Sequence, residues 1–221
     1  SKKPGVFRHK GKVFGLLICE DIWEEGPLEE LSKLNVDYVV CVNASPYEFN
    51  KTKNKFNIIQ NRLNKLNDFF LVYLNCVGGQ DELLFDGNSF ITKPNKNSPN
   101  NLPFFSGQFI SQNIIADFSN KNHIEITRKY ENFPFHRKIL EDPIKQINSM
   151  NEEKFLIYNL LNGLILAMKD YVEKNSIKKL FLGLSGGIDS AVVLFISSKV
   201  ISREKITAIM MPSEFTSDVS L

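Results

Sequence analysis

Short apolar runs alternate with longer stretches in which apolar residues recur at helical spacing. The runs at 12–19, 38–42 and 69–74 predict buried strands. Between them, residues 27–34 and 52–67 place their apolar side chains on one face, as expected of amphipathic helices. This alternation of strand and helix predicts an α/β fold with a parallel sheet.

The pattern then changes to shorter strands, and the chain outside the apolar runs predicts loops. Residues 88–92 and 112–117 predict strands on either side of a polar loop at 93–101. Residues 1–12, with a proline and a glycine near the start, predict a loop that enters the first strand. Alternation followed by short strands favours a layered α/β sandwich over a barrel.

The apolar period fades between residues 129 and 150, where two prolines also occur. Such a lapse is typical of a linker between domains. We therefore predict a first domain at 1–128, a linker at 129–147 and a second domain at 148–221.

The second domain begins with a long amphipathic helix predicted at 151–174. It leads to a buried strand at 180–184, an apolar helix at 191–200 and a second strand at 205–210. One strand-turn-helix-strand unit cannot cover both faces of a parallel sheet. We therefore expect the second domain to be cut short and the chain to be an internal segment of a longer protein.

The composition argues against nucleic acid and membranes as partners. The net charge of the 221 residues is +2, which provides no basic field for nucleic acid. No apolar run approaches the roughly 20 residues of a membrane span, and no signal peptide is visible. The three cysteines, Cys19, Cys41 and Cys76, cannot all pair, which favours a reduced, cytoplasmic protein.

The strand at 180–184 runs into Ser-Gly-Gly-Ile-Asp-Ser, which opens the following helix with Asp189 or Ser190 predicted at its N-cap. Two glycines let the backbone approach a ligand, and a helix N-terminus favours an anion such as phosphate. A kinase-type P-loop is excluded because no lysine follows the glycines before Lys199. A glycine turn that serves only packing is the alternative.

This hexapeptide resembles the signature of the PP-loop ATP pyrophosphatases. That resemblance implies that ATP is bound and that pyrophosphate is released from it. By position, the predicted ATP contacts are Gly183, Leu184, Ser185, Gly186, Gly187, Ile188, Asp189 and Ser190. Asp189 would also contact Mg²⁺, although it could equally serve as a plain helix cap.

Cys19 lies at the carboxyl end of the first buried strand, where open α/β folds place their chemistry. An exposed thiol at a strand end can act as a nucleophile. A small buried hydrophobic residue is the alternative for Cys19, and it is our interpretation of Cys41 and Cys76.

Three further segments support a catalytic interpretation of Cys19. They are Ile18 to Trp23, Asn43 to Tyr47 and Gly78 to Gly87. Together they resemble the glutaminase domain of glutamine-dependent NAD synthetases, a branch of the nitrilase superfamily, in which a PP-loop domain follows. The resemblance implies a partial nitrilase-like α-β-β-α sandwich followed by the start of a doubly wound parallel-sheet domain.

The same resemblance implies roles for three residues of the first domain. Cys19 would attack the side-chain amide of glutamine, while Ser45 and Lys51 would contact the amino-acid end of that substrate. Ser45 could instead be a turn residue, and Lys51 a solvated surface lysine. The glutamate base and the oxyanion lysine of the family would precede this chain, which alone is therefore expected to be inactive.

The implied reaction amidates deamido-NAD with ammonia from glutamine, at the expense of ATP. ATP, glutamine, deamido-NAD and Mg²⁺ would be the ligands, and the enzyme would be a cytoplasmic homo-oligomer. Two alternatives stay open: an amidase fused to a different PP-loop ligase, and a non-catalytic fragment or pseudoenzyme that binds ATP.

Overall fold

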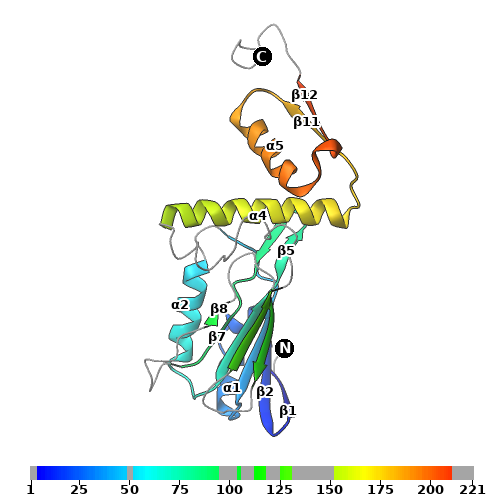
Figure 1. Cartoon of the computed structure of the whole chain (residues 1–221). Helices are drawn as coiled ribbons and strands as arrows, with labels where there is room; N and C mark the ends of the chain where they lie inside the picture. Colours follow the sequence, from blue (N-terminus) through cyan, green and yellow to red (C-terminus); the bar gives the residue numbers. More distant parts are fainter. Residues whose placement is uncertain are drawn as a thin grey trace. The chain divides into compact units, whose positions relative to one another are not determined.

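The computed structural model describes residues 4–48, 52–94, 104–105, 112–117, 125–130 and 152–210. The chain divides into two compact units (Figure 1). The first comprises Ser1–Val77 and Phe85–Glu131, and the second comprises Gly78–Leu84 and Asn132–Leu221. The strands at 38–43 and 180–184 belong to different sheets, as the sequence predicts.

A six-stranded sheet forms the centre of the first unit, in the order β1-β2-β3-β4-β7-β8. Strands β2, β3 and β4 are parallel, and the outer pairings are antiparallel. The bounds are β1 Gly5–His9, β2 Lys12–Ile18, β3 Tyr38–Asn43, β4 Phe70–Asn75, β7 Phe90–Thr92 and β8 Phe104–Phe105. The carboxyl ends of β2, β3 and β4 therefore meet at one edge.

Helices α1 (Pro27–Lys33) and α2 (Thr52–Leu63) contribute side chains to the core on one face of this sheet. Proline opens α1 where its missing amide donor costs nothing. Residues of β2, β3, β4 and β7 supply most of the remaining core, and the connecting segments add Ile22, Val36 and Phe69. Its fully buried members include Leu17, Leu28, Leu31, Val39, Ile59, Leu63 and Leu71.

The opposite face carries a row of stacked aromatic rings. Phe14 stacks on Tyr38 at 5.2 Å between centroids, and Tyr38 stacks on Phe70 at 5.7 Å. Farther along the strands, Ile18 and Val42 of the same face are exposed. Alternate residues of each strand thus face either the helices or this second surface.

Strand β1 contradicts the predicted loop at residues 1–12. His9 pairs with Lys12, so Lys10 and Gly11 form a two-residue turn. Both have positive φ, 46° and 74°, as the tight turns that suit hairpins require. The sequence signal is weak because lysine, rather than asparagine or aspartate, occupies the first turn position.

Several boundaries also differ from the prediction. Helix α2 ends at Leu63 rather than residue 67, and β7 begins at Phe90. A short hairpin, β5 (Val77–Gln80) and β6 (Leu83–Asp86), was not predicted. Strand β9 (Gln112–Asp117) matches, whereas β10 (Glu125–Tyr130) enters the predicted linker, the rest of which lies outside the described residues.

The second unit contains a two-stranded parallel sheet, β11 (Leu180–Leu184) and β12 (Ile206–Met210). Helix α5 (Ile188–Val200) and a short 3₁₀ turn, Arg203–Lys205, connect the two strands. The long helix α4 (Glu152–Lys174) packs against α5. None of the helices in the described part of the chain combines the length and apolar character that a membrane span requires.

The prediction that β11 is buried on both faces is wrong. The exposed fraction of Phe181 is 66%, and every second residue of the strand is exposed. A two-stranded sheet with one connecting helix can cover only one face. The described residues therefore cover only part of the apolar surface of this strand.

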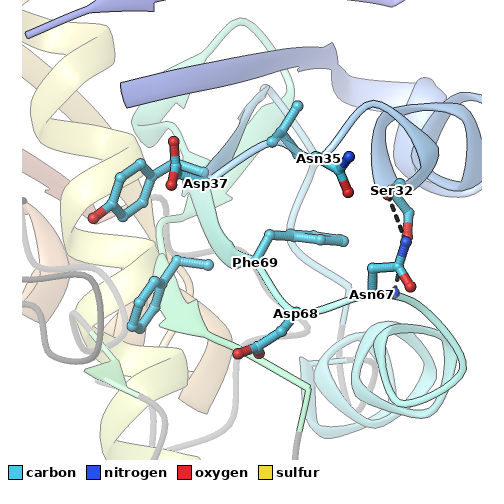
Figure 2. Close-up of a pocket in the computed structure, with 9 residues that line it drawn as sticks. Ser32, Asn35, Asp37, Asn67, Asp68 and Phe69 are labelled. Atoms are coloured by element: carbon cyan, nitrogen blue, oxygen red, sulfur yellow. Dashed lines mark hydrogen bonds between the residues drawn. The ribbon is translucent and has the colours of Figure 1, made fainter. Parts of the chain in front are cut away.

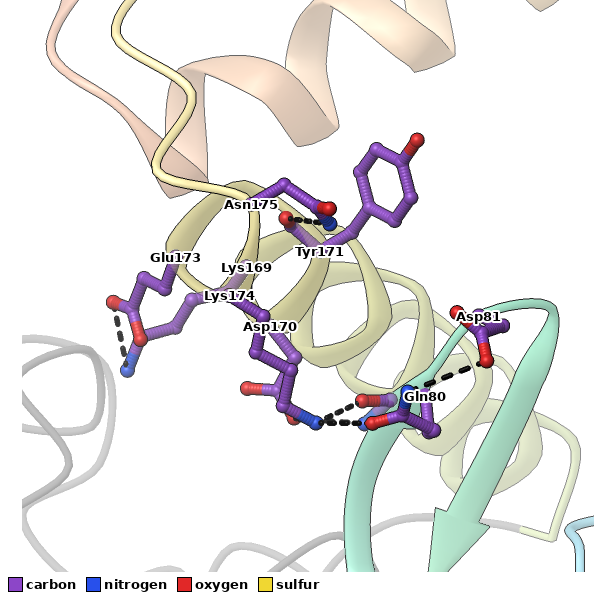
Figure 3. A network of polar contacts seen from close by, with 9 residues as sticks. Gln80, Asp81, Lys169, Asp170, Tyr171, Glu173, Lys174 and Asn175 are labelled. Carbon is purple, nitrogen blue, oxygen red and sulfur yellow. Dashed lines mark hydrogen bonds and ion pairs between the residues drawn. The ribbon is translucent and has the colours of Figure 1, made fainter.

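The tip of the β5–β6 hairpin lies on helix α4 (Figure 3). The backbone amide of Gly79 donates to Asp170 Oδ2 at 2.8 Å, and Lys174 Nζ donates to the carbonyl of Gly79. A Cβ at Gly79 would lie 2.9 Å from the Cα of Ala167, closer than real Cβ atoms approach. Glycine is therefore required where the hairpin contacts the helix.

Candidate functional site

Cys19 lies immediately beyond the carboxyl end of β2, at the first residue of a 3₁₀ turn, Cys19–Ile22. Its φ is +46°, a conformation that residues other than glycine rarely adopt. The backbone amide of Ile18 donates to Asp21 Oδ2 at 2.9 Å, which holds the start of the turn. The half-buried Cys19 thus occupies a sharp strand-to-turn bend, a place where strained backbone often marks function.

The other two cysteines differ from each other. Cys41 is buried in β3, and burial raises the pKa of its thiol to about 12. This thiol stays protonated at neutral pH, which fits the predicted structural role. Cys76 is exposed, so the prediction that it is a buried hydrophobic residue is wrong. It follows the last residue of β4, and its backbone amide donates to the carbonyl of Asn43 at 3.1 Å.

The carboxyl ends of β3 and β4 are joined by two asparagines at paired positions, Asn43 and Asn75. Asn43 Nδ2 donates to the carbonyl of Leu74 at 2.9 Å. Asn75 Oδ1 accepts from the backbone amide of Ser45 at 2.9 Å, and Asn75 Nδ2 donates to the carbonyl of Ser45 at 3.2 Å. These bonds fix the segment that carries Ser45 at the same sheet edge as Cys19.

Lys55, which sequence reasoning missed, contacts Ser45 directly. Its Nζ donates to Ser45 Oγ at 2.7 Å and to the carbonyl of Pro46 at 3.3 Å. Lys51, predicted to contact glutamine, lies outside the described residues. No sequence signal pairs Lys55 with Ser45, because the contact joins helix α2 to a loop ten residues earlier.

A pocket of about 290 Å³ opens at the other end of the strands (Figure 2). Its lining includes Asp37 at the start of β3 and Phe69 just before β4. Asp37 Oδ2 accepts the backbone amide of Val13 at 2.8 Å, and Asn67 Nδ2 donates to the carbonyl of Ser32. These polar groups tie the strands and α1 together, away from Cys19 and Ser45.

In the second unit, the glycine turn connects β11 to α5 through a set of serine contacts. The hydroxyls of Ser185 and Ser190 lie 3.2 Å apart, and Ser190 Oγ donates to the carbonyl of Gly187 at 2.9 Å. The amide of Gly187 donates to Ser185 Oγ at 3.3 Å. The turn is thus held by its own side chains, with the exposed start of α5 beside it.

The N-cap of α5 is Gly187, which corrects the predicted Asp189 or Ser190. Asp189 lies one residue inside the helix and is exposed. Gly187 has no side chain to cap the first amides, which leaves them suited to an anion. The positive φ of the turn, +78°, is at Gly186.

The predicted ATP contacts thus lie together at one end of β11. Gly183 and Leu184 end the strand, and the remaining predicted residues form the turn and the first turn of α5. No group of three metal-binding side chains occurs among the residues that the structure describes. Asp189 offers a single carboxylate, which fits Mg²⁺ bound largely through phosphate oxygens and water.

Both units match known protein families. Residues 2–98 match the carbon-nitrogen hydrolase model, and residues 160–221 match the NAD synthase model. A glutamine-dependent NAD(+) synthetase of Acinetobacter baylyi is 38% identical over 98% of the chain, which spans 35% of that protein. The Aquifex aeolicus enzyme of the same description is 31% identical over 99% of the chain, which spans 40% of it.

The chain is a homologue of glutamine-dependent NAD(+) synthetases. The solved structure of the Acinetobacter baumannii glutamine-dependent NAD+ synthetase, in complex with ADP, matches with a TM-score of 0.75 and 34% identity. It covers 98% of this chain and 36% of that protein. A synthetase from Cytophaga hutchinsonii, at 18% identity and a TM-score of 0.56, supports the fold alone and covers 89% of this chain and 26% of that one.

These similarities confirm the predicted fold class: a nitrilase-like region precedes the start of a synthetase-type region. The chain spans little more than a third of the length of the relatives that it matches. The predicted boundaries at 128 and 147 and the roles of the individual site residues stay predictions.

Proposed function

We propose that this chain is part of a glutamine-dependent NAD synthetase, which amidates deamido-NAD with ammonia taken from glutamine. The observation that carries the proposal is the similarity to such synthetases over 98% of the chain. In this chain the Cys19 turn precedes the glycine turn, which is the order that the proposal requires. A cytoplasmic homo-oligomer without nucleic-acid or membrane partners stays a prediction.

At the first site, Cys19 Sγ would attack the amide carbon of glutamine. The carbon–nitrogen bond breaks, ammonia leaves with an added proton, and a thioester forms on sulfur. Water then hydrolyses the thioester to glutamate and frees the thiol. Ser45 lies at the same sheet edge, held by Asn75 and Lys55, and would contact the amino-acid end of glutamine.

At the second site, the carboxylate of deamido-NAD would attack the α-phosphorus of ATP and release pyrophosphate. Ammonia would then displace AMP from the acyl-adenylate to form the amide. The turn from Ser185 to Ser190 would hold the phosphates through backbone amides at the start of α5. Mg²⁺ bound by Asp189 and phosphate oxygens would offset the negative charge during this step.

The decisive experiment separates the two nitrogen sources in the full-length protein. Cys19→Ala is expected to abolish NAD formation with glutamine, because the amide-splitting step loses its nucleophile. Synthesis from added ammonium should stay within about two-fold of the parent, since the adenylation site is untouched. The measurement is NAD formation from deamido-NAD and ATP with each nitrogen source.

Cys76→Ala provides the matched control, because Cys76 is an exposed cysteine of the same unit. It should leave both activities unchanged. Equal loss with glutamine and ammonium in the Cys19→Ala variant would contradict the assignment of Cys19. A parent that forms no NAD but amidates another ATP-activated acceptor would replace the synthetase proposal by a different PP-loop ligase.

A further inference from the structure

The end of the 3₁₀ turn that begins at Cys19 is bound by Arg62 of helix α2. Arg62 Nη1 donates to the carbonyl of Ile22 at 2.6 Å, and Nη2 donates to the carbonyl of Glu24. Ile22 is the last residue of the turn, and its side chain is buried in the core. Packing thus fixes the side chain of Ile22, whereas Arg62 fixes the direction of its carbonyl.

The guanidinium of Arg62 is itself held in place by Glu29 of α1. Its Nε and Nη2 donate to the two carboxylate oxygens of Glu29, at 2.8 Å each. The Arg62 side chain is only 18% exposed, so its charge requires such a partner. The four hydrogen bonds use both sides of a rigid, planar group. A rotated guanidinium would lose several of them at once, which keeps it in one orientation.

The backbone of Cys19 makes this anchor consequential. Its φ is +46°, and a strained conformation of this kind persists only where the surrounding contacts over-determine it. On the strand side, the amide of Ile18 donates to Asp21 Oδ2 at 2.9 Å. On the far side, Arg62 holds the carbonyl of Ile22. The turn that presents the thiol is therefore fixed at both ends.

We propose that Arg62 is a positioning residue for Cys19, which keeps the thiol in the orientation needed to attack an amide carbon. The inference rests on the proposed glutaminase function of Cys19. The described side-chain contacts of Arg62 are with Glu29 and the two carbonyls, so its effect reaches the thiol through the backbone of the turn. A nucleophile displaced by even a small distance slows the chemical step.

The test is Arg62→Lys in the full-length protein. Lysine keeps a positive charge beside Glu29, but one ammonium cannot reproduce the planar fork that binds a carboxylate and two carbonyls. We expect the single-turnover rate of thioester formation at saturating glutamine to fall at least about ten-fold. The glutamine concentration that gives half of this rate should stay within about two-fold, because binding is not the step that Arg62 serves. NAD synthesis from added ammonium should also stay within about two-fold.

Lys65→Met is the matched control, since Lys65 is an exposed cation just beyond the end of α2. It should leave thioester formation and ammonium-dependent synthesis unchanged.

A double variant, Glu29→Gln with Arg62→Met, guards against a folding defect. It removes both charges together, so neither is left buried without its partner. A cooperative melting transition and parental synthesis from ammonium would verify folding. Thioester formation should fall as in Arg62→Lys, because the carbonyls of Ile22 and Glu24 have lost their donor.

The outcomes separate the inference from the proposed function. A parent that forms no thioester with glutamine would refute the glutaminase function itself. With an active parent, folded variants that form the thioester at the parental rate would overturn the positioning role. Equal loss with glutamine and ammonium would also overturn it and assign Arg62 to general stability. A higher half-saturating glutamine concentration at an unchanged maximal rate would contradict it too, since Arg62 would then act on binding.

Discussion

Two residues with positive φ, Cys19 and Gly186, mark the two candidate sites. The sequence indicates both positions, but for different reasons. Cys19 is identified by its place after a strand and by neighbouring motifs, whereas its strained backbone has no sequence signal. At the glycine turn, composition alone does not distinguish the roles of Gly186 and Gly187, because glycine adopts either sign of φ readily.

Gly186→Ala should impair ATP binding, since alanine is strained at φ +78° and the turn would shift. We expect a stability loss of about 1 kcal/mol and at least a ten-fold lower rate of pyrophosphate release with saturating ammonium. The measurement is pyrophosphate release from ATP and deamido-NAD by the full-length protein.

Gly11→Ala controls for backbone strain alone. Gly11 has a similar φ, +74°, in the β1–β2 turn, and a Cβ added there would meet no atom within 4 Å. It should lose a similar amount of stability but release pyrophosphate at the parental rate. An unchanged rate in folded Gly186→Ala would mean that this turn does not bind the phosphates.

At the scale of elements, the sequence predicted the parallel strands well because their apolar runs are long and continuous. The parallel strand β11 has its predicted bounds, and so does the antiparallel strand β9. The hairpin strands β1, β5 and β6 were missed, since they are short and their turns have little periodicity. The contact between Lys55 and Ser45 was missed for another reason: it joins a helix to a loop, and spacing does not report such pairs.

Arg62 of α2 connects to α1 and to the segment after Cys19. Its guanidinium makes two bonds of 2.8 Å to the carboxylate of Glu29 and one of 2.6 Å to the carbonyl of Ile22. Burial raises the pKa of Glu29, but the bonds from Arg62 and from the Gly26 amide outweigh burial and hold the pKa below 4.5. The charged carboxylate is therefore the form that stabilises the fold.

Glu29→Gln should reduce the free energy of unfolding at pH 7 by about 1 kcal/mol, because the neutral glutamine amide replaces the carboxylate that pairs with Arg62. A lowered folded-state pKa contributes stability above the unfolded value of 4.5 and loses it as pH falls through the folded value. The difference in melting temperature between parent and variant should thus shrink below pH 4.5.

Glu30→Gln removes the same charge from the neighbouring, exposed position and should change stability by less than about 0.5 kcal/mol at either pH. A Glu29→Gln deficit that persists undiminished at pH 3 would show that the contribution does not depend on ionisation.

At the scale of the whole molecule, the two units do not divide the chain at a single point. Residues 78–84, the tip of the β5–β6 hairpin, belong with α4 in the second unit, although residues on either side belong to the first. The sequence predicted one linker that begins near residue 129, and it did not predict that an earlier segment belongs to the second unit. Local periodicity indicates individual helices and strands. This division depends instead on contacts between residues about 90 positions apart, such as Gly79 and Asp170.

Gly79→Ala should therefore destabilise the second unit selectively. The new Cβ would lie 2.9 Å from Ala167 Cα and 3.2 Å from its carbonyl oxygen, so the hairpin tip must move away from α4. Such overpacking costs about 1–3 kcal/mol and would also weaken the 2.8 Å bond to Asp170. Hydrogen exchange should show lost protection at the Gly79 amide and along α4, with strands β2 to β4 unchanged. Gly5→Ala, whose Cβ would lie 3.6 Å from Leu16, should change neither region. Undiminished protection of the Gly79 amide after its substitution would mean that the close approach to α4 does not hold the hairpin tip.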